Sequence, residues 1–168
     1  MPRFTQIQPD QIDQNVFKLI GADWMLVAAG TAENFNMMTA SWGGMGVLWN
    51  KNICWCVIRP QRYTFQFVED NDMFSLSFFD EEHRAALKHH GTVSGRDSDK
   101  MQNSGLTPIV DDSTGVYFEE ARLVLACRKI YYQDLEPANL LDPTIQANYP
   151  QKDYHRMYFG EIVHCLRR

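Results

Sequence analysis

The chain has 168 residues, 45% of them hydrophobic and 22% charged, which is typical of one globular domain spanning residues 1–168. The formal net charge of −5 argues against general binding to nucleic acids or anionic membranes, because these polyanions attract basic proteins. No apolar segment approaches the ~20 residues of a membrane-spanning helix, and no secretory signal is visible, so we expect a cytoplasmic protein.

Short apolar runs and runs of alternating polarity dominate the chain, and both patterns predict strands. The predicted strands span residues 16–21, 24–29, 35–41, 53–58, 73–79, 116–129 and 157–165. Three short helices are predicted over residues 62–68, from residue 80 to 89 or 90, and from residue 97 or 98 to 105. Because the helices do not alternate regularly with the strands, this order favours a closed antiparallel barrel with short helical insertions.

Two further features concern the interior of this barrel and its cover. Cys54 and Cys56 lie two residues apart in an apolar run, so both side chains face one side of a strand and cannot easily bridge each other. Their spacing does not match a zinc module, and we expect buried free thiols and no metal site. Residues 135–153 carry three prolines, and we expect an irregular segment that covers a site or acts as a dimer arm.

Residues 36–46 form the first candidate binding segment. Asn36, Thr39 and Ser41 lie in or at the end of a predicted strand, and Trp42 and three glycines follow. The glycine spacing matches neither a Rossmann fingerprint nor a P-loop. Because glycines let a backbone approach a ligand closely, the segment could border a flat ligand; a plain hairpin with turn glycines is the alternative.

Two basic segments offer places for an anion. Arg59 and Thr64 flank the start of a predicted helix, where unpaired amides and the helix dipole favour a phosphate, whereas Arg62 is expected to lie in solvent. The loop of residues 94–100 combines glycine and serine with two cations, and it could wrap an anion or form a charged surface loop. Together with residues 36–46, these segments predict a site for a planar ligand that carries a phosphate, such as flavin mononucleotide (FMN).

His155 is the histidine that stands out as a candidate site residue. It lies between the irregular segment and the final predicted strand, where it could face a cofactor and donate a proton or a hydrogen bond. A purely structural role is the alternative. The sequence supports no Ser-His-Asp or Cys-His catalytic set, so no other catalytic residue is predicted.

Seven short motifs follow one another along the chain. They are residues 38–46 (MTASWGGMG), 59–64 (RPQRYT), 74–79 (FSLSFF), 94–100 (SGRDSDK), 117–121 (YFEEA), 131–135 (YYQDL) and 154–162 (YHRMYFGEI). In this order they resemble the flavin reductase-like, FMN-binding split-barrel family, and within it the flavoredoxin-type branch. The resemblance covers almost the whole chain, and several motifs in series are far more specific than any one of them.

The resemblance implies a Greek-key split barrel, a homodimer, and an FMN held non-covalently at the barrel rim near the subunit interface. Asn36 and Trp42 would border the isoalloxazine ring, and Thr64 and Lys100 would hold the phosphate. The other implied contacts are the backbone of Thr39, Ala40 and Ser41 at the polar edge of the ring, Arg59, Ser94 and Gly95 beside the phosphate, and Gln133 and His155 near the ring or the dimer contact.

The resemblance also implies an oxidoreductase that moves electrons between a reduced donor, such as NAD(P)H, and a flavin or another small acceptor. Short flavin reductases commonly carry a Gly-Asp-His motif linked to NADH use, and residues 128–134 lack it in the comparable place. An FMN-carrying electron-transfer protein that serves a redox protein partner is therefore the alternative function. A barrel that serves only for binding or assembly is a third.

Overall fold

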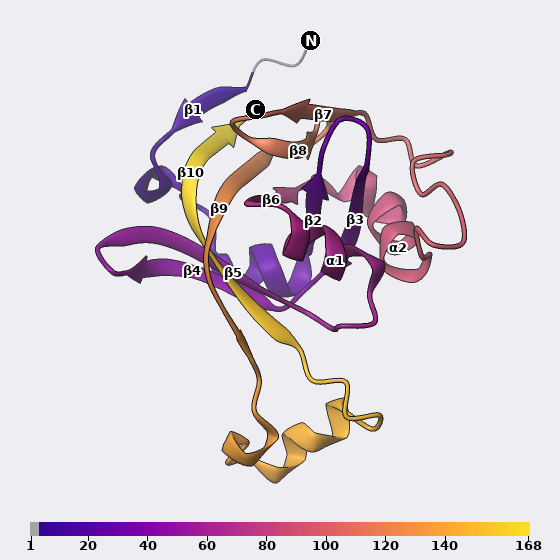
Figure 1. The fold of residues 1–168 in the computed structure, drawn as a ribbon. Coiled ribbons are helices and arrows are strands. Elements are labelled where there is room, and N and C mark those ends of the chain that lie inside the picture. The colour runs from indigo at the N-terminus through magenta and orange to yellow at the C-terminus, as the bar shows by residue number, and fades with distance from the viewer. Residues whose placement is uncertain (1–3) are drawn as a thin grey trace.

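The computed structural model describes residues 4–168, which form a mainly antiparallel β fold with short helices (Figure 1). None of the helices in residues 4–168 is long and apolar enough to span a membrane. The strands are β1 (Thr5–Ile7), β2 (Met25–Gly30), β3 (Phe35–Ala40), β4 (Gly43–Leu48), β5 (Lys51–Ile58), β6 (Met73–Phe78), β7 (Pro108–Asp111), β8 (Gly115–Phe118), β9 (Leu123–Asp134) and β10 (Arg156–Arg167). The helices are α1 (Tyr63–Asp70) and α2 (Arg84–Thr92), with shorter helical turns at Pro9–Gln11, Lys18–Ala22, Glu81–His83, Pro137–Asn139 and Pro143–Asn148.

One antiparallel sheet contains the strands in the order β3-β2-β6-β9-β10-β5-β4, and β1 adds to β10. Strands β7 and β8 form a separate pair. Although β3 and β4 follow each other in the chain, they lie at opposite edges of the large sheet. The mainly β fold with short helical insertions that the sequence predicts is confirmed.

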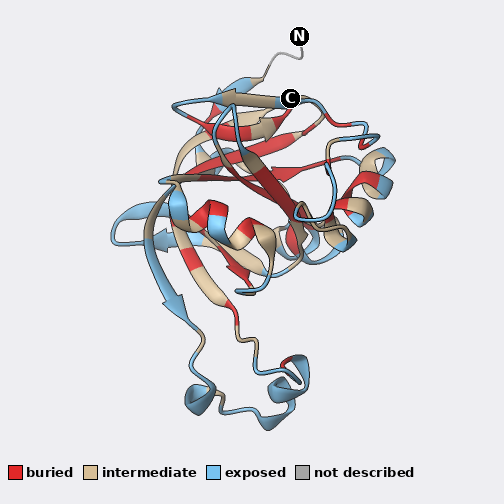
Figure 2. Ribbon diagram, turned by 45° about the vertical axis from the view of Figure 1, so that its right-hand side comes forward, coloured by how far each residue is buried: buried red, intermediate tan, exposed pale blue. Residues whose placement is uncertain are grey.

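Strand β2 lies between two hydrophobic cores, because successive side chains of a strand point to opposite faces. Met25, Val27 and Ala29 pack in one core, and Leu26 and Ala28 pack in the other. All five are fully buried, and Figure 2 shows the central strands in the colour of buried residues. Burial on both faces requires a continuous apolar run, which is why the sequence predicts this strand nearly to its bounds.

The predicted strand over residues 16–21 is wrong, because this segment is helical. Leu19 and Ile20 are adjacent and both buried, whereas a strand with one buried face would bury only one of them. The side chain of Asn15 accepts a hydrogen bond from the amide of Lys18 at 3.1 Å and so supports the start of the helical turn.

Two other predictions differ from the structure. The predicted strand over residues 116–129 is divided into β8 and β9 by a turn, in which the amide of Ala121 bonds the carbonyl of Phe118 at 3.1 Å. The predicted helix over residues 97–105 is a series of turns. Serine, aspartate and asparagine are frequent there, and their side chains favour turns over helix interiors.

Residues Gly43–Leu48 form strand β4, where the sequence suggests only a loose turn. Gly44 allows close packing rather than a turn, because a Cβ there would lie 2.5 Å from the indole nitrogen of Trp55 in β5. The chain reverses at Trp49 and Asn50, whose φ angles of 53° and 56° are those of a two-residue hairpin turn.

The four cysteines are buried free thiols, as predicted. Cys54 in β5 and Cys127 in β9 lie on either side of β10, and their Sγ atoms are 2.9 Å apart. Gly160 of β10 leaves room for this contact, since a Cβ there would lie 2.6 Å from the Cβ of Cys127.

Strands β9 and β10 extend beyond the barrel, and residues 135–155 connect them at the far end (Figure 1). We call residues 135–155 the arm. Most of its residues are exposed, as Figure 2 shows, and Leu141 is 94% exposed. The arm is the irregular segment that the sequence predicts between the last two strands.

Candidate functional site

Lys100 is a buried cation at the centre of the candidate site. It is 4% exposed, and Nζ donates hydrogen bonds to the carbonyls of Met37 and His90, the second at 2.9 Å. Within residues 4–168, no carboxylate lies at ion-pair distance from Nζ. Burial, and then the charge of Arg62, lower the pKa of Lys100 from 10.5 to about 8. A buried cation whose partners are carbonyls alone is suited to bind an anion.

A cavity of about 240 Å³ lies beside Lys100, and we call it the phosphate cavity. Thr64, in the first turn of α1, lines this cavity, and its hydroxyl accepts a hydrogen bond from Nδ2 of Asn36 at 2.9 Å. Helix α1 has no side-chain cap at its start, so amides of its first turn are available to an anion. Gly95 forms another wall, where a Cβ would lie 2.4 Å from Oδ1 of Asn36.

Arg62 lies at the phosphate cavity, whereas the side chain of Arg59 contacts the arm. Arg62 lines the cavity and donates to the carbonyl of Gly91 at 3.4 Å. Burial, and then the charge of Arg59, lower the pKa of Arg62. Arg59 instead reaches the arm, where it pairs with Asp153 at 2.7 Å and lies 5.0 Å from the ring centroid of Tyr149.

A second cavity, of about 260 Å³ and mainly apolar, adjoins the phosphate cavity, and we call it the ring cavity. The two cavities share Gly91 and Thr92 of α2, and we call the two together the groove. Gly91 lets α2 lie against β3, because a Cβ there would lie 3.4 Å from the Cβ of Thr39. The remaining lining residues of the ring cavity are Trp24, Thr39, Ala40, Ser41, Leu87 and Lys88.

Ser41 and Trp42 connect the two edges of the sheet. Strand β3 ends at Ala40 and β4 begins at Gly43, and neither strand pairs with the other. Within residues 4–168, the amides of Ser41 and Trp42 take part in no hydrogen bond. They are therefore available as donors to the polar edge of a ligand in the ring cavity.

Trp42 and the arm meet at the end of this groove. Trp42 is 46% exposed, and its ring centroid lies 5.2 Å from that of His155. His155 is buried, and its Nδ1 lies 2.7 Å from the hydroxyl of Tyr149. Burial, and then the charge of Arg59, lower the pKa of His155 to about 4, so its ring is neutral at pH 7.

Gln133 lies outside the groove. It is exposed on β9, and its Oε1 accepts a hydrogen bond from the hydroxyl of Tyr131 at 2.8 Å. The predicted site residues that line neither the phosphate cavity nor the ring cavity are Trp42, Arg59, Gln133 and His155. Arg59 lies close enough to Arg62 and His155 for its charge to lower the pKa of both. The predicted residues that line the groove are Asn36, Thr39, Ala40, Ser41, Thr64, Ser94, Gly95 and Lys100.

Sequence reasoning missed several residues of the groove, among them Arg62, Gly91 and Trp24. Arg62 looks like a solvated arginine near a helix start, and only the tertiary fold makes it half-buried. Gly91 gives a usable signal, since an isolated glycine in a helix often has a packing reason. Trp24 gives none: its φ of 72° is unusual for a bulky residue, and the guanidinium of Arg84 lies 3.3 Å from its ring centroid.

A family model described as the flavin reductase-like domain matches residues 18–168. The chain belongs to this family. The family predicted from the sequence motifs is therefore confirmed. No curated protein matches the sequence.

Solved structures of flavin reductase-like proteins confirm the split-barrel fold. An FMN-binding domain of a flavin reductase-like enzyme from Shewanella baltica is 18% identical, with a TM-score of 0.70 over 99% of this chain and 78% of that chain. A flavoredoxin from Methanosarcina acetivorans is 22% identical, with a TM-score of 0.67 over 96% of this chain and 76% of that chain. An NADH:FAD oxidoreductase from Streptomyces globisporus, in complex with NAD and FAD fragments, is 15% identical, with a TM-score of 0.64 over 87% of this chain and 74% of that chain.

Proposed function

We propose that this flavin reductase-like protein binds FMN non-covalently and works as an oxidoreductase between a reduced donor and a flavin or other small acceptor. The observation that carries the proposal is Lys100, a buried cation that lines the phosphate cavity and has only carbonyl partners. Such a cation is stabilised when an anion enters the cavity. The family supplies the flavin context, and the residues of this chain fit the phosphate.

The phosphate cavity would hold the FMN phosphate. Lys100 and Arg62 supply positive charge, and the hydroxyl of Thr64 and the first-turn amides of α1 supply hydrogen bonds. Gly95 supports this assignment, because a side chain there would collide with Asn36 and Tyr63 and so alter the wall of the cavity.

The ring cavity would hold the isoalloxazine ring. Its apolar walls, among them Trp24 and Leu87, suit the flat face of the ring. The amides of Ser41 and Trp42 can donate to the polar edge of the ring, where they would stabilise negative charge. Lys88 lines the same cavity and adds a positive charge at its rim.

FMN, when bound, supplies hydride and single-electron chemistry. The chain would orient the cofactor, and His155, whose ring is neutral at pH 7, would donate a hydrogen bond. Nδ1 of His155 shares a hydrogen bond with the hydroxyl of Tyr149, and when the hydroxyl is the donor the neutral imidazole carries its proton on Nε2. Its contact with Trp42, which follows Ser41 of the ring cavity, supports a position for this group near the ring.

An FMN-carrying electron-transfer protein is the second candidate. Residues 128–134 of β9 lack the Gly-Asp-His motif linked to NADH use. The two candidate functions therefore differ in whether the protein oxidises NAD(P)H directly or delivers electrons to a redox protein partner, and the absorbance measurement below distinguishes them.

We also propose that the chain forms a homodimer through its arm and the adjoining end of β9. Strands β9 and β10 project from the barrel, and Tyr131, Tyr132 and Leu141 are 42%, 53% and 94% exposed (Figure 1). Large apolar side chains on a projecting segment favour a contact with a second copy. Light scattering coupled to gel filtration should give twice the 19.5 kDa chain mass, and the monomer mass would contradict a dimer.

An absorbance spectrum of the purified protein tests the proposed function. Protein-bound flavin bands that bleach on anaerobic addition of NADH or NADPH would support an NAD(P)H-dependent reductase. Bands that persist would favour the electron carrier. If no bands of protein-bound flavin appear even after FMN is added, the chain does not bind FMN, and the proposal is wrong.

A further inference from the structure

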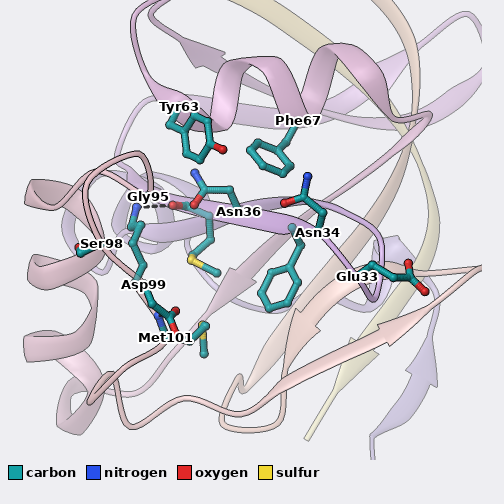
Figure 3. A pocket seen from close by; sticks show the side chains of 12 residues that line it. Glu33, Asn34, Asn36, Tyr63, Phe67, Gly95, Ser98, Asp99 and Met101 are labelled. Carbon is teal, nitrogen blue, oxygen red and sulfur yellow. Dashed lines mark hydrogen bonds between the residues drawn. The ribbon is translucent and has the colours of Figure 1, made fainter.

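Figure 3 shows a cavity of about 200 Å³ that shares Gly95 and Lys100 with the phosphate cavity and belongs to the same site. A separate cavity, of about 160 Å³, lies at the other end of α2, and we call it the arginine cavity. Arg84 of α2 and Arg122, the residue before β9, both line it. Leu87 is the only one of its described lining residues that also lines the groove. The arginine cavity is therefore not part of the site proposed for FMN.

Arg84 is a cation that is held in place without a carboxylate partner. Its Nη1 donates to the carbonyls of Ala22 and Asp23 at 2.7 and 3.0 Å, and its guanidinium lies 3.3 Å from the ring centroid of Trp24. Among residues 4–168, no carboxylate lies at ion-pair distance from Arg84, and its Nε and Nη2 make no hydrogen bond. A fixed guanidinium with two free N–H groups along one edge is suited to bind a carboxylate through two parallel hydrogen bonds.

Arg122 brings a second guanidinium to the cavity. Its Nη2 pairs with Asp23 at 2.8 Å and its Nε donates to the carbonyl of Phe79 at 3.1 Å, whereas Nη1 bonds no group in the described part of the chain. Asp23 also pairs with Lys18 at 2.7 Å, so its carboxylate is already engaged by two cations. Arg84, Arg122 and Asp23 together carry one net positive charge, which one carboxylate of a ligand would neutralise.

Two further carboxylates lie at the rim of the arginine cavity. The side chain of Asp80 is 69% exposed, against 24% for Arg122, and its Oδ1 lies 3.6 Å from Nε of Arg122, which is beyond hydrogen-bond distance. Glu81 is exposed on the same rim. These rim charges disfavour a ligand with several negative charges, because like charges repel. Phe79 and Leu87 add apolar lining that suits a short alkyl chain.

We propose that the arginine cavity binds a small organic monocarboxylate. Its carboxylate would lie between Arg84 and Arg122, and its short apolar chain would contact Phe79 and Leu87. This site goes beyond the proposed function and does not depend on FMN. The ligand would lie behind Trp24, which stacks on Arg84 and lines the ring cavity.

Saturation-transfer NMR with butyrate as the probe tests this inference on the full chain, with and without FMN. Arg84→Gln and Arg122→Gln each remove one guanidinium of the cavity. Arg128→Gln is the matched control, because Arg128 is 56% exposed in its side chain and pairs with Glu161 on the sheet, away from the arginine cavity. Asp80→Asn removes a rim charge, and the exposed Asp80 side chain makes no cap hydrogen bond, so this variant should fold. Circular dichroism establishes which variants are folded.

Butyrate should bind the wild-type protein with a dissociation constant of about 1 mM or less, whether or not FMN is present. Arg84→Gln or Arg122→Gln should weaken this binding about tenfold or more, because a charge-assisted contact is lost. Arg128→Gln should change it by less than about twofold. Asp80→Asn should strengthen it about twofold to fivefold, because Asp80 no longer competes with the ligand for Arg122.

Three results would overturn the inference and leave the proposed function intact. The first is no binding of butyrate at ~10 mM, or equal binding by the wild type and all folded variants. The second is displacement of butyrate by FMN, which would place the probe in the groove. The third is inorganic phosphate binding more tightly than butyrate, which would assign a polyvalent anion to the cavity. Failure of FMN to bind would overturn the proposed function alone, since butyrate is also titrated without it.

Discussion

Lys100 is the residue whose replacement tests the phosphate cavity most sharply. Lys100→Ala removes a charge-assisted contact of ~1.5–3 kcal/mol, so FMN affinity should fall about tenfold to hundredfold. The affinity for riboflavin, which lacks the phosphate, should change little. Isothermal titration calorimetry with both ligands measures the difference.

Lys51→Ala is the matched control for this substitution. Lys51 also carries one positive charge, but it is 44% exposed in its side chain and pairs with Glu161 on the sheet, away from the groove. The Lys51→Ala variant should bind FMN with the affinity of the wild type. If Lys100→Ala and Lys51→Ala behave alike, the phosphate does not lie at Lys100.

The titration of Lys100 predicts opposite pH dependences for stability and for binding. Its folded pKa of about 8 lies below the ordinary 10.5. Below pH 8 the ammonium is protonated in both the folded and unfolded states, and the cost of burying it is fully present. Between pH 8 and 10.5 the unfolded chain binds more protons, so this group makes the ligand-free protein more stable as pH rises.

FMN affinity should instead fall as pH rises above 8, by up to about tenfold per pH unit, because the free site loses the proton that the phosphate needs. Lys100→Met lacks this titration, so its affinity and its stability difference from the wild type isolate the contribution of the lysine. Urea unfolding between pH 8 and 10.5 measures the stability, and FMN titration over the same pH range measures the affinity. A wild-type affinity that does not change between pH 8 and 10.5 would contradict the assignment.

At the scale of elements, Gly160 in β10 allows the strands on its two sides to approach. A Cβ there would lie 2.6 Å from the Cβ of Cys127 and 2.7 Å from Cζ of Phe74. Gly160→Ala should therefore lower the free energy of unfolding by ~1–3 kcal/mol. Gly46→Ala is the control, because its Cβ would meet nothing within 4 Å. Equal urea midpoints for the two variants would show that the barrel adapts to the added methyl.

Sequence patterns predict the helices and strands best where a strand is buried on both faces. The runs that become β2 and β6 are buried on both faces, and their bounds are nearly right. Strand β2 is apolar throughout, whereas β6 alternates apolar residues with the small Ser75 and Ser77. The sequence pattern fails where tertiary contacts decide whether a residue lies in a turn or in a strand. Gly44 in β4 looks like a turn residue, yet it packs beneath the indole of Trp55.

The sequence likewise predicts some residues of the candidate site, and tertiary contacts determine others. Thr64, Gly95 and Lys100 come from motifs that the sequence displays, and the fold brings them to one cavity. The two arginines could not be told apart, because Arg59 and Arg62 flank the same turn. Which of them faces the cavity depends on Asp153, a residue far along the chain that pairs with Arg59.

At the scale of the whole molecule, Arg59 joins the barrel to the arm, and Arg62 serves the groove. Arg62→Ala should lower FMN affinity about tenfold. Arg59→Ala should lower it less but should release the arm, because Asp153 loses its ion pair and the carbonyl of Asn148 loses its donor. Limited digestion with chymotrypsin near the exposed Leu141 should then be faster in Arg59→Ala than in Arg62→Ala. The reverse order in either experiment would exchange the two roles.

The most direct test of a flavin phosphate held by a buried cation compares FMN with riboflavin on the wild-type chain. The two ligands share the ring and differ in the phosphate, so their affinity ratio isolates the phosphate cavity. We predict that FMN binds about a hundredfold more tightly than riboflavin, since several charge-assisted contacts are lost with the phosphate. Equal dissociation constants would contradict the account.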